Sequence, residues 1–144
     1  MLHRRTRRLL VLVGVAYVTA CLVIGFWPSH VDAPVDDSIG RVLSYLHSVG
    51  VPHVVDYRFI ERGANVLLFA PLGMLAAAGL SRRHWWIALA ACITLSGVIE
   101  LGQALLLPGR SASWSDILTN SVGATIGVGI TMLMRRRTPG TTSR

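Results

Sequence analysis

The sequence contains few charged residues for its length. Asp, Glu, Lys and Arg make up 15% of its 144 residues, and all fourteen basic residues are arginine. A soluble helical domain needs polar faces on its helices, and no helix-length segment of this chain shows one. Hydrophobic residues account for 52% of the sequence. This composition excludes an ordinary soluble domain and indicates a membrane protein.

Cysteine is equally scarce. The two cysteines, Cys21 and Cys92, lie in different apolar segments, and counting along them at about 1.5 Å per residue places the two thiols in opposite halves of a membrane. We expect no disulfide between them and interpret both as small lipid-facing or packing residues. His47 and His53 stand in a connecting segment without the spacing of a metal site, so we expect no metal and no cofactor.

The net charge of +7 does not indicate a nucleic acid partner. The arginines flank the apolar segments instead of forming a stripe on a folded surface, which is the pattern that nucleic acid binding requires. Arginines at the ends of membrane spans contact anionic lipid headgroups, so membrane lipids are the expected partners.

Long apolar stretches are what the sequence does contain. A spanning helix needs about 20 apolar residues. Four stretches approach or reach this length, at 9–27, 65–80, 85–107 and 117–134. The second is the shortest and contains Pro71, so its helix is expected to begin a few residues earlier. We predict one all-α domain over 1–144, a four-helix transmembrane bundle with spans at about 9–27, 62–80, 85–107 and 117–134.

The charge distribution predicts the orientation of the bundle. Arginines cluster in the head of the chain, at Arg82 and Arg83 between the second and third spans, and in a tail at 135–144. With four spans these three places fall on one side, which the positive-inside rule assigns to the cytoplasm. Both termini are therefore expected inside. The outer loop at 28–61 has apolar residues at helical spacing after Asp36 and Asp37, which predicts a short amphipathic helix on the outer surface.

The first span has features of a signal peptide. A basic head precedes the apolar run, and Val18–Cys21 resembles a lipoprotein cleavage box. The apolar run continues to Trp27, however, and exceeds the roughly 7–15 residues of a cleaved apolar region. We expect this segment to remain as a membrane span.

Polar side chains within the spans gather toward the predicted outer side. In the third span Ser96, Glu100 and Gln103 are spaced i, i+4 and i+7 and share one helical face. Glu100 lies about 22 Å along the axis from Trp85, in the outer third of a core about 30 Å thick. Ionisable groups at such depth are costly and usually functional. The candidate ligand-binding residues are Asn65, Ser96, Glu100, Gln103, Arg110, Asp116 and Asn120.

Some of these residues also admit a purely structural interpretation. Ser113-x-x-Asp116 loosely resembles a capping box at the start of the last span, and a Glu100–Arg110 pair would fix the geometry of the bundle. Residues that favour helix packing form a second group, in which Gly123 and Gly127 have the small-xxx-small spacing that permits close approach. This helix-packing group consists of Pro71, Gly73, Gly123 and Gly127.

Three blocks of the sequence resemble the VanZ-like family of bacterial membrane proteins. They are Asn65-Val-Leu-Leu-Phe69-Ala-Pro71-Leu-Gly73, then Ser96-x-x-x-Glu100-x-x-Gln103, then Arg110 through Asp116 and Asn120 to Gly127. The resemblance covers residues 61–134 and implies a small multi-pass protein of the bacterial cytoplasmic membrane. The founding member of that family is linked to resistance to teicoplanin, a glycopeptide with a lipid tail that acts outside the membrane.

The sequence thus favours a binding protein for a lipid-linked or amphiphilic ligand at the outer leaflet, such as a lipid-linked cell-wall precursor or a lipoglycopeptide. The alternatives are an intramembrane enzyme with Glu100 and Asp116 as acid and base, or a membrane scaffold protein. The sequence shows no nucleophile–base pair and no phosphate-binding loop, so no catalytic residue is assigned. It does not fix the oligomeric state.

Overall fold

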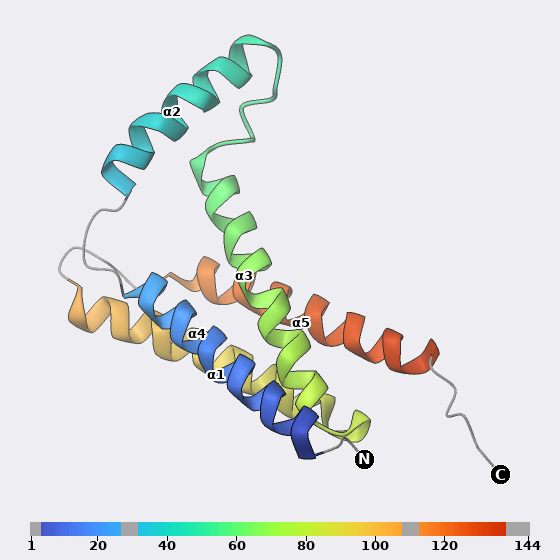
Figure 1. The fold of residues 1–144 in the computed structure, drawn as a ribbon. Coiled ribbons are helices and arrows are strands. Elements are labelled where there is room, and N and C mark those ends of the chain that lie inside the picture. Colours follow the sequence, from blue (N-terminus) through green and yellow to red (C-terminus); the bar gives the residue numbers. More distant parts are fainter. Residues whose placement is uncertain (1–3, 27–31, 108–112, 138–144) are drawn as a thin grey trace.

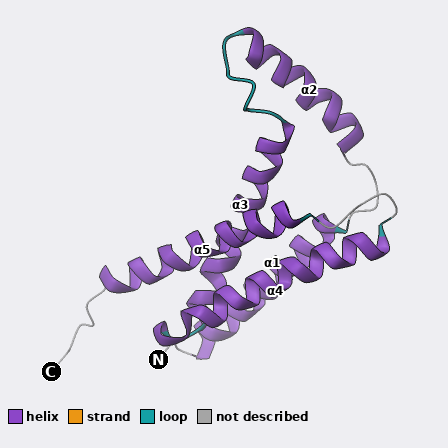
Figure 2. Ribbon diagram, turned by 180° about the vertical axis from the view of Figure 1, so that it is seen from behind, coloured by secondary structure: helices purple, strands orange, loops and turns teal. Residues whose placement is uncertain are grey.

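The computed structural model describes residues 4–26, 32–107 and 113–137, and these residues contain helices and no strand (Figure 2). The elements are α1 (Arg4–Gly25), α2 (Asp32–Ser48), α3 (Tyr57–Gly79), the short 3-10 helix η1 (Arg82–His84), α4 (Trp85–Leu106) and α5 (Trp114–Arg137). Helices α1, α3, α4 and α5 are each long and apolar enough to cross a membrane. The predicted all-α fold with four membrane spans is confirmed, and the chain is a multi-pass membrane protein.

Helix α3 is the central element of the bundle. It crosses α5 near the middle of both helices, while α1 and α4 lie on its other sides (Figure 1). Phe69 and Leu72 of α3 form one core cluster with Cys92 and Ile99 of α4 and with Ala124 of α5. A second, smaller cluster joins Ala77, Ala88 and Val128 nearer the other end of the same helices. Both cysteines are buried, so neither faces lipid.

The crossing of α3 and α5 depends on small residues. A Cβ atom added at Gly73 would collide with the backbone of Ala124, and one at Gly123 would collide with the backbone of Val66. A Cβ at Gly127 would lie 2.8 Å from the backbone nitrogen of Met74. These glycines therefore let two helix backbones touch, which is how membrane helices gain packing energy without a hydrophobic driving force. Pro71 lies within α3, and the helix continues through it.

Helix α3 begins earlier than the predicted span at about 62–80. Its first residue is Tyr57, because the side chain of Asp56 accepts a hydrogen bond of 2.8 Å from the backbone N–H of Phe59 and caps the helix. Helix α2 lies beside this early part of α3 and apart from the other spans (Figures 1 and 2). His47 of α2 is 3.1 Å from the carbonyl oxygen of Val55, which holds the two helices together at the turn.

Helix α5 extends past the predicted span, and Arg135 belongs to the bundle instead of a free tail. Its guanidinium donates hydrogen bonds of 2.9 Å to the carbonyl oxygen of Leu80 and 2.8 Å to that of Ala78. Carbonyl groups at a helix C-terminus have no partner within their own helix, and a cation also complements the helix dipole there. Arg135 therefore ties the end of α3 to the end of α5.

We expect Arg135→Met to lower the free energy of unfolding by about 2 kcal/mol, because two carbonyl groups lose a charged donor. Thermal denaturation of the purified protein in detergent would measure this loss. Arg136→Met is the matched control. Arg136 is exposed, and this substitution removes the same charge one residue further along α5. Equal melting temperatures for the two variants would contradict the capping role of Arg135.

Candidate functional site

A cavity of about 310 Å³ lies where α1, α3, α4 and α5 meet. Most of its polar wall comes from α3, α4 and α5, whereas α1 contributes Cys21, Ile24 and Gly25. The polar side chains that line it are Tyr57, Glu61, Asn65, Glu100, Gln103, Asp116 and Asn120. Tyr57 and Glu61 are exposed, while Glu100 and Asn120 are each only 5% exposed, so the cavity runs from the surface of α3 into the bundle.

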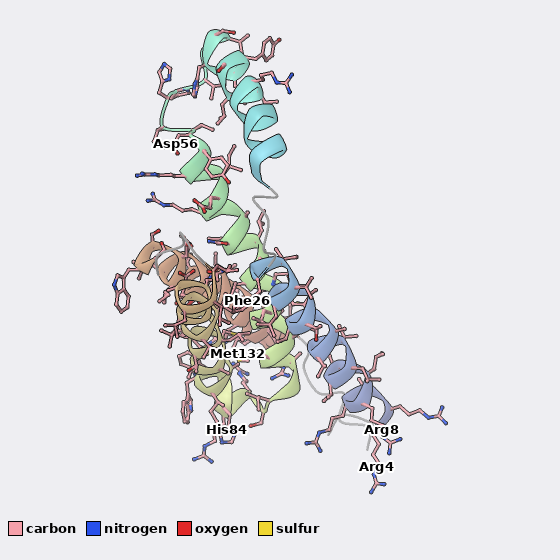
Figure 3. The ribbon with its side chains drawn as sticks, turned by 90° about the vertical axis from the view of Figure 1, so that its left-hand side faces the viewer. Arg4, Arg8, Phe26, Asp56, His84 and Met132 are labelled. Atoms are coloured by element: carbon pink, nitrogen blue, oxygen red, sulfur yellow. The ribbon has the colours of Figure 1, made fainter. Side chains whose placement is uncertain are left out.

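The cavity occupies the end of the bundle opposite the arginine clusters of α1, η1 and the end of α5. The last residues of α1 and the first two turns of α5 line it. These two segments lie at the same end of the bundle because α1 and α5 run in opposite directions. In Figure 3, Phe26 and Asp56 mark this end, and Arg4, Arg8 and His84 lie at the other. Polar cavity and arginine clusters are therefore separated along the direction that crosses the membrane.

Glu100 holds the start of α5. Its Oε2 atom accepts a hydrogen bond of 2.8 Å from the backbone N–H of Ser113, the residue that precedes α5. The hydroxyl of Ser113 accepts from the backbone N–H of Asp116 at 3.4 Å. In a capping box the carboxylate of Asp116 would itself bind the N–H of Ser113. Glu100 takes that role here, and the carboxylate of Asp116 instead lines the cavity and accepts from the Ser115 hydroxyl at 3.3 Å.

Asn120 forms the deepest polar contact of the site. Its Nδ2 atom donates a hydrogen bond of 2.9 Å to the hydroxyl of Ser96 on α4, which is itself fully buried. The Oδ1 atom of Asn120 is buried and has no hydrogen-bond partner among the residues that the structure describes. A buried amide oxygen without a partner costs about 1–3 kcal/mol, and such groups are rare in folded proteins.

Gln103 has a structural contact at the rim. Its amide nitrogen, Nε2, donates a hydrogen bond of 2.8 Å to the carbonyl oxygen of Gly25, at the end of α1. One residue earlier, a Cβ at Gly102 would lie 3.0 Å from Cε1 of the Phe26 ring, so α4 has no side chain where this ring packs. These two contacts seat the end of α1 on α4 and close one wall of the cavity.

The structure brings most of the sequence-predicted ligand-binding residues to one place. Asn65, Glu100, Gln103, Asp116 and Asn120 line the cavity, and Ser96 lies behind Asn120. Arg110 falls outside the described residues. The helix-packing glycines lie at the α3–α5 crossing, behind the wall that Asn65 and Asn120 form.

The lining residues that the sequence did not predict include Tyr57, Glu61 and Cys21. Tyr57 and Glu61 were assigned to the outer loop, because the apolar stretch begins only after them. The signal for them was present, since Asp56 is a good N-cap residue and Glu61 and Asn65 are spaced i and i+4 on one helical face. Nothing in the sequence indicated Cys21, whose place depends on how α1 packs against the other helices.

Comparison with known proteins identifies the family of this chain. A family model described as VanZ/LLP1 matches residues 14–135, which is most of the chain. The chain belongs to the VanZ/LLP1 family. The match extends from α1 through α5, so the membership of this VanZ/LLP1 protein rests on all four spans and not on the polar blocks alone. Searches of curated proteins and of solved structures found no significant match.

Proposed function

We propose that this VanZ/LLP1 protein binds the polar headgroup of a lipid-linked or amphiphilic molecule in the cavity between α1, α3, α4 and α5. The observation that carries this proposal is a cavity whose wall combines three acidic residues, Glu61, Glu100 and Asp116, with the amide residues Asn65, Gln103 and Asn120. A bundle held only by packing does not require a polar cavity, since small residues achieve close contact without one.

The arginine distribution supports an outward-facing cavity. The positive-inside rule assigns to the cytoplasm the end of the bundle at which the arginine clusters lie. These arginines are Arg4, Arg5, Arg7 and Arg8 of α1, Arg82 and Arg83 of η1, and Arg135 and Arg136 of α5. The cavity at the other end then opens at the depth of the outer headgroups. An amphiphile whose tail stays in the membrane reaches this position without leaving the bilayer. We place the protein in the bacterial cytoplasmic membrane. The ligand class that we propose is a lipid-linked cell-wall precursor or a teicoplanin-type lipoglycopeptide, of whose headgroup only a part enters the cavity of about 310 Å³.

We expect Asp116→Asn to weaken binding of teicoplanin by about tenfold, because a hydrogen bond to a charged acceptor contributes about 1.5–3 kcal/mol. Isothermal titration calorimetry of the purified protein in detergent micelles would measure the affinity. In cells where the wild-type protein raises teicoplanin tolerance, the same variant is expected to lower that tolerance at unchanged protein level.

Asp56→Asn is the matched control for this substitution. It makes the same chemical change outside the cavity, and asparagine also caps helices well, so α3 keeps its first turn. Wild-type affinity in Asp116→Asn, or an equal loss in Asp56→Asn, would refute the proposed site. Unchanged ligand recovered after incubation supports binding, whereas release of a product would replace this proposal with an intramembrane enzyme.

A further inference from the structure

A second cavity of about 310 Å³ lies on the outside of the bundle, between α1 and α3 and at the arginine end. One wall comes from α1 and the other from α3, each contributing residues at helical spacing. The lining residues are Arg7, Leu10, Val11, Gly14, Val18, Leu72, Leu75, Ala76, Gly79 and Leu80. Arg7 is the one charged residue among these described lining residues, and we call this cavity the α1–α3 groove.

Glycines on both walls keep the α1–α3 groove open. A Cβ atom added at Gly14 of α1 or at Gly79 of α3 would find no other atom within 4 Å. The groove closes toward the middle of the membrane, where the Tyr17 hydroxyl donates a hydrogen bond of 2.8 Å to the carbonyl oxygen of Leu68. On the arginine side of this hydrogen bond, α1 makes few packing contacts with the bundle, since Cys21 is the one buried residue in the helix.

The length and charge of the α1–α3 groove match half of a phospholipid bilayer. From Arg7 to Val18 the groove is about 16 Å long, and one leaflet of the hydrocarbon core is about 15 Å thick. Its walls are apolar along this length, as an acyl chain requires. Arg7 stands at the open end, where a lipid phosphate would lie, and the exposed side chains of Arg4 and Arg8 lie at the same end (Figure 3).

We propose that the α1–α3 groove binds one anionic phospholipid of the cytoplasmic leaflet, with an acyl chain between the helices and the phosphate at Arg7. A zwitterionic lipid carries the same phosphate, but its cationic headgroup would add a positive charge beside Arg4, Arg7 and Arg8, so these arginines favour a lipid of net negative charge. A second copy of the chain would place another arginine-rich α1 against this one, and like charges would oppose that contact. This site is independent of the polar cavity, which lies at the other end of the bundle.

Native mass spectrometry of the full chain, with phosphatidylglycerol or phosphatidylcholine of the same acyl chains added to the detergent, tests the proposal. The wild-type protein is expected to retain one phosphatidylglycerol more strongly than phosphatidylcholine. Arg7→Gln is expected to lower that retention about fivefold, which corresponds to about 1 kcal/mol for one basic residue at an anionic surface. Arg8→Gln removes the same charge one residue away from the groove and is expected to keep most of the retention.

Gly14→Leu separates the groove from simple charge attraction. The added side chain enters open space, so we expect a folded protein that retains neither lipid, with helix content checked by circular dichroism. Gly79→Leu fills the opposite wall and serves the same purpose if Gly14→Leu fails to fold. Equal losses for Arg7→Gln and Arg8→Gln, or full retention by the filled variants, would overturn the site. A dimer that persists without lipid and dissociates in Gly14→Leu would assign the groove to a second copy.

Discussion

Replacing Gly127 by leucine is expected to prevent assembly of α3 with α5. A Cβ atom at this position would collide with the carbonyl oxygen of Ala70 and lie 2.8 Å from the backbone nitrogen of Met74. These are backbone atoms in the middle of a helix, so neither can move aside as a side chain would. Overpacking of a core already costs about 1–3 kcal/mol when side chains absorb it, and we expect a loss of at least about 3 kcal/mol here.

The measurement is the yield and melting temperature of the purified protein, compared with Gly129→Leu. Gly129 is two residues further along α5, and a Cβ there would meet no other atom within 4 Å. Both variants exchange glycine for a residue with higher helix propensity, so helix formation alone would stabilise both. A Gly127→Leu protein that melts like Gly129→Leu would show that the two backbones do not touch at this crossing.

Truncation of Glu100 has the second-largest expected effect. Glu100→Ala leaves the N–H of Ser113 without its carboxylate acceptor at the start of α5, where backbone donors have no partner within the helix. Loss of a charged acceptor for a part-buried donor costs about 2–3 kcal/mol. We therefore expect a lower melting temperature and faster hydrogen exchange in the first turn of α5, which mass spectrometry of peptic peptides would detect.

Glu100→Gln provides the comparison that identifies the cause. Glutamine keeps an oxygen that can accept from Ser113, and it removes only the negative charge. We expect its melting temperature to stay close to that of the wild type, within about 1 kcal/mol of stability. If Glu100→Gln and Glu100→Ala were equally destabilised, the charge of Glu100 would matter and its hydrogen bond to Ser113 would not.

The separation of these two effects also bears on the proposed function. Glu100 both holds α5 and lines the polar cavity, so reduced ligand binding in a Glu100 variant has two explanations. Asp116 has less of this ambiguity, because the cap uses its backbone N–H. Its carboxylate lines the cavity and accepts from the adjacent Ser115 hydroxyl, a hydrogen bond that an asparagine oxygen could also accept. Asp116→Asn is for this reason the substitution that tests binding.

The sequence alone determined the spans and the end of the membrane at which the polar groups lie. Both follow from local rules, because length and hydropathy define a span and helical rise fixes the depth of a residue such as Glu100. The periodicity of Ser96, Glu100 and Gln103 likewise placed them on one face of α4. The sequence predicted the start of α3 less well. Asp56 caps this helix, so it begins at Tyr57, within the predicted outer loop.

Only the tertiary structure decided what each polar group contacts. Gln103 binds the end of α1, and Glu100 replaces Asp116 in the cap of α5. The amide nitrogen of Asn120 donates to Ser96, while its oxygen has no partner within the described part of the chain. Such pairings depend on the rotation and crossing of helices far apart in the chain. That geometry depends on close backbone contacts at Gly73, Gly123 and Gly127. The residue pattern within a single helix does not predict it.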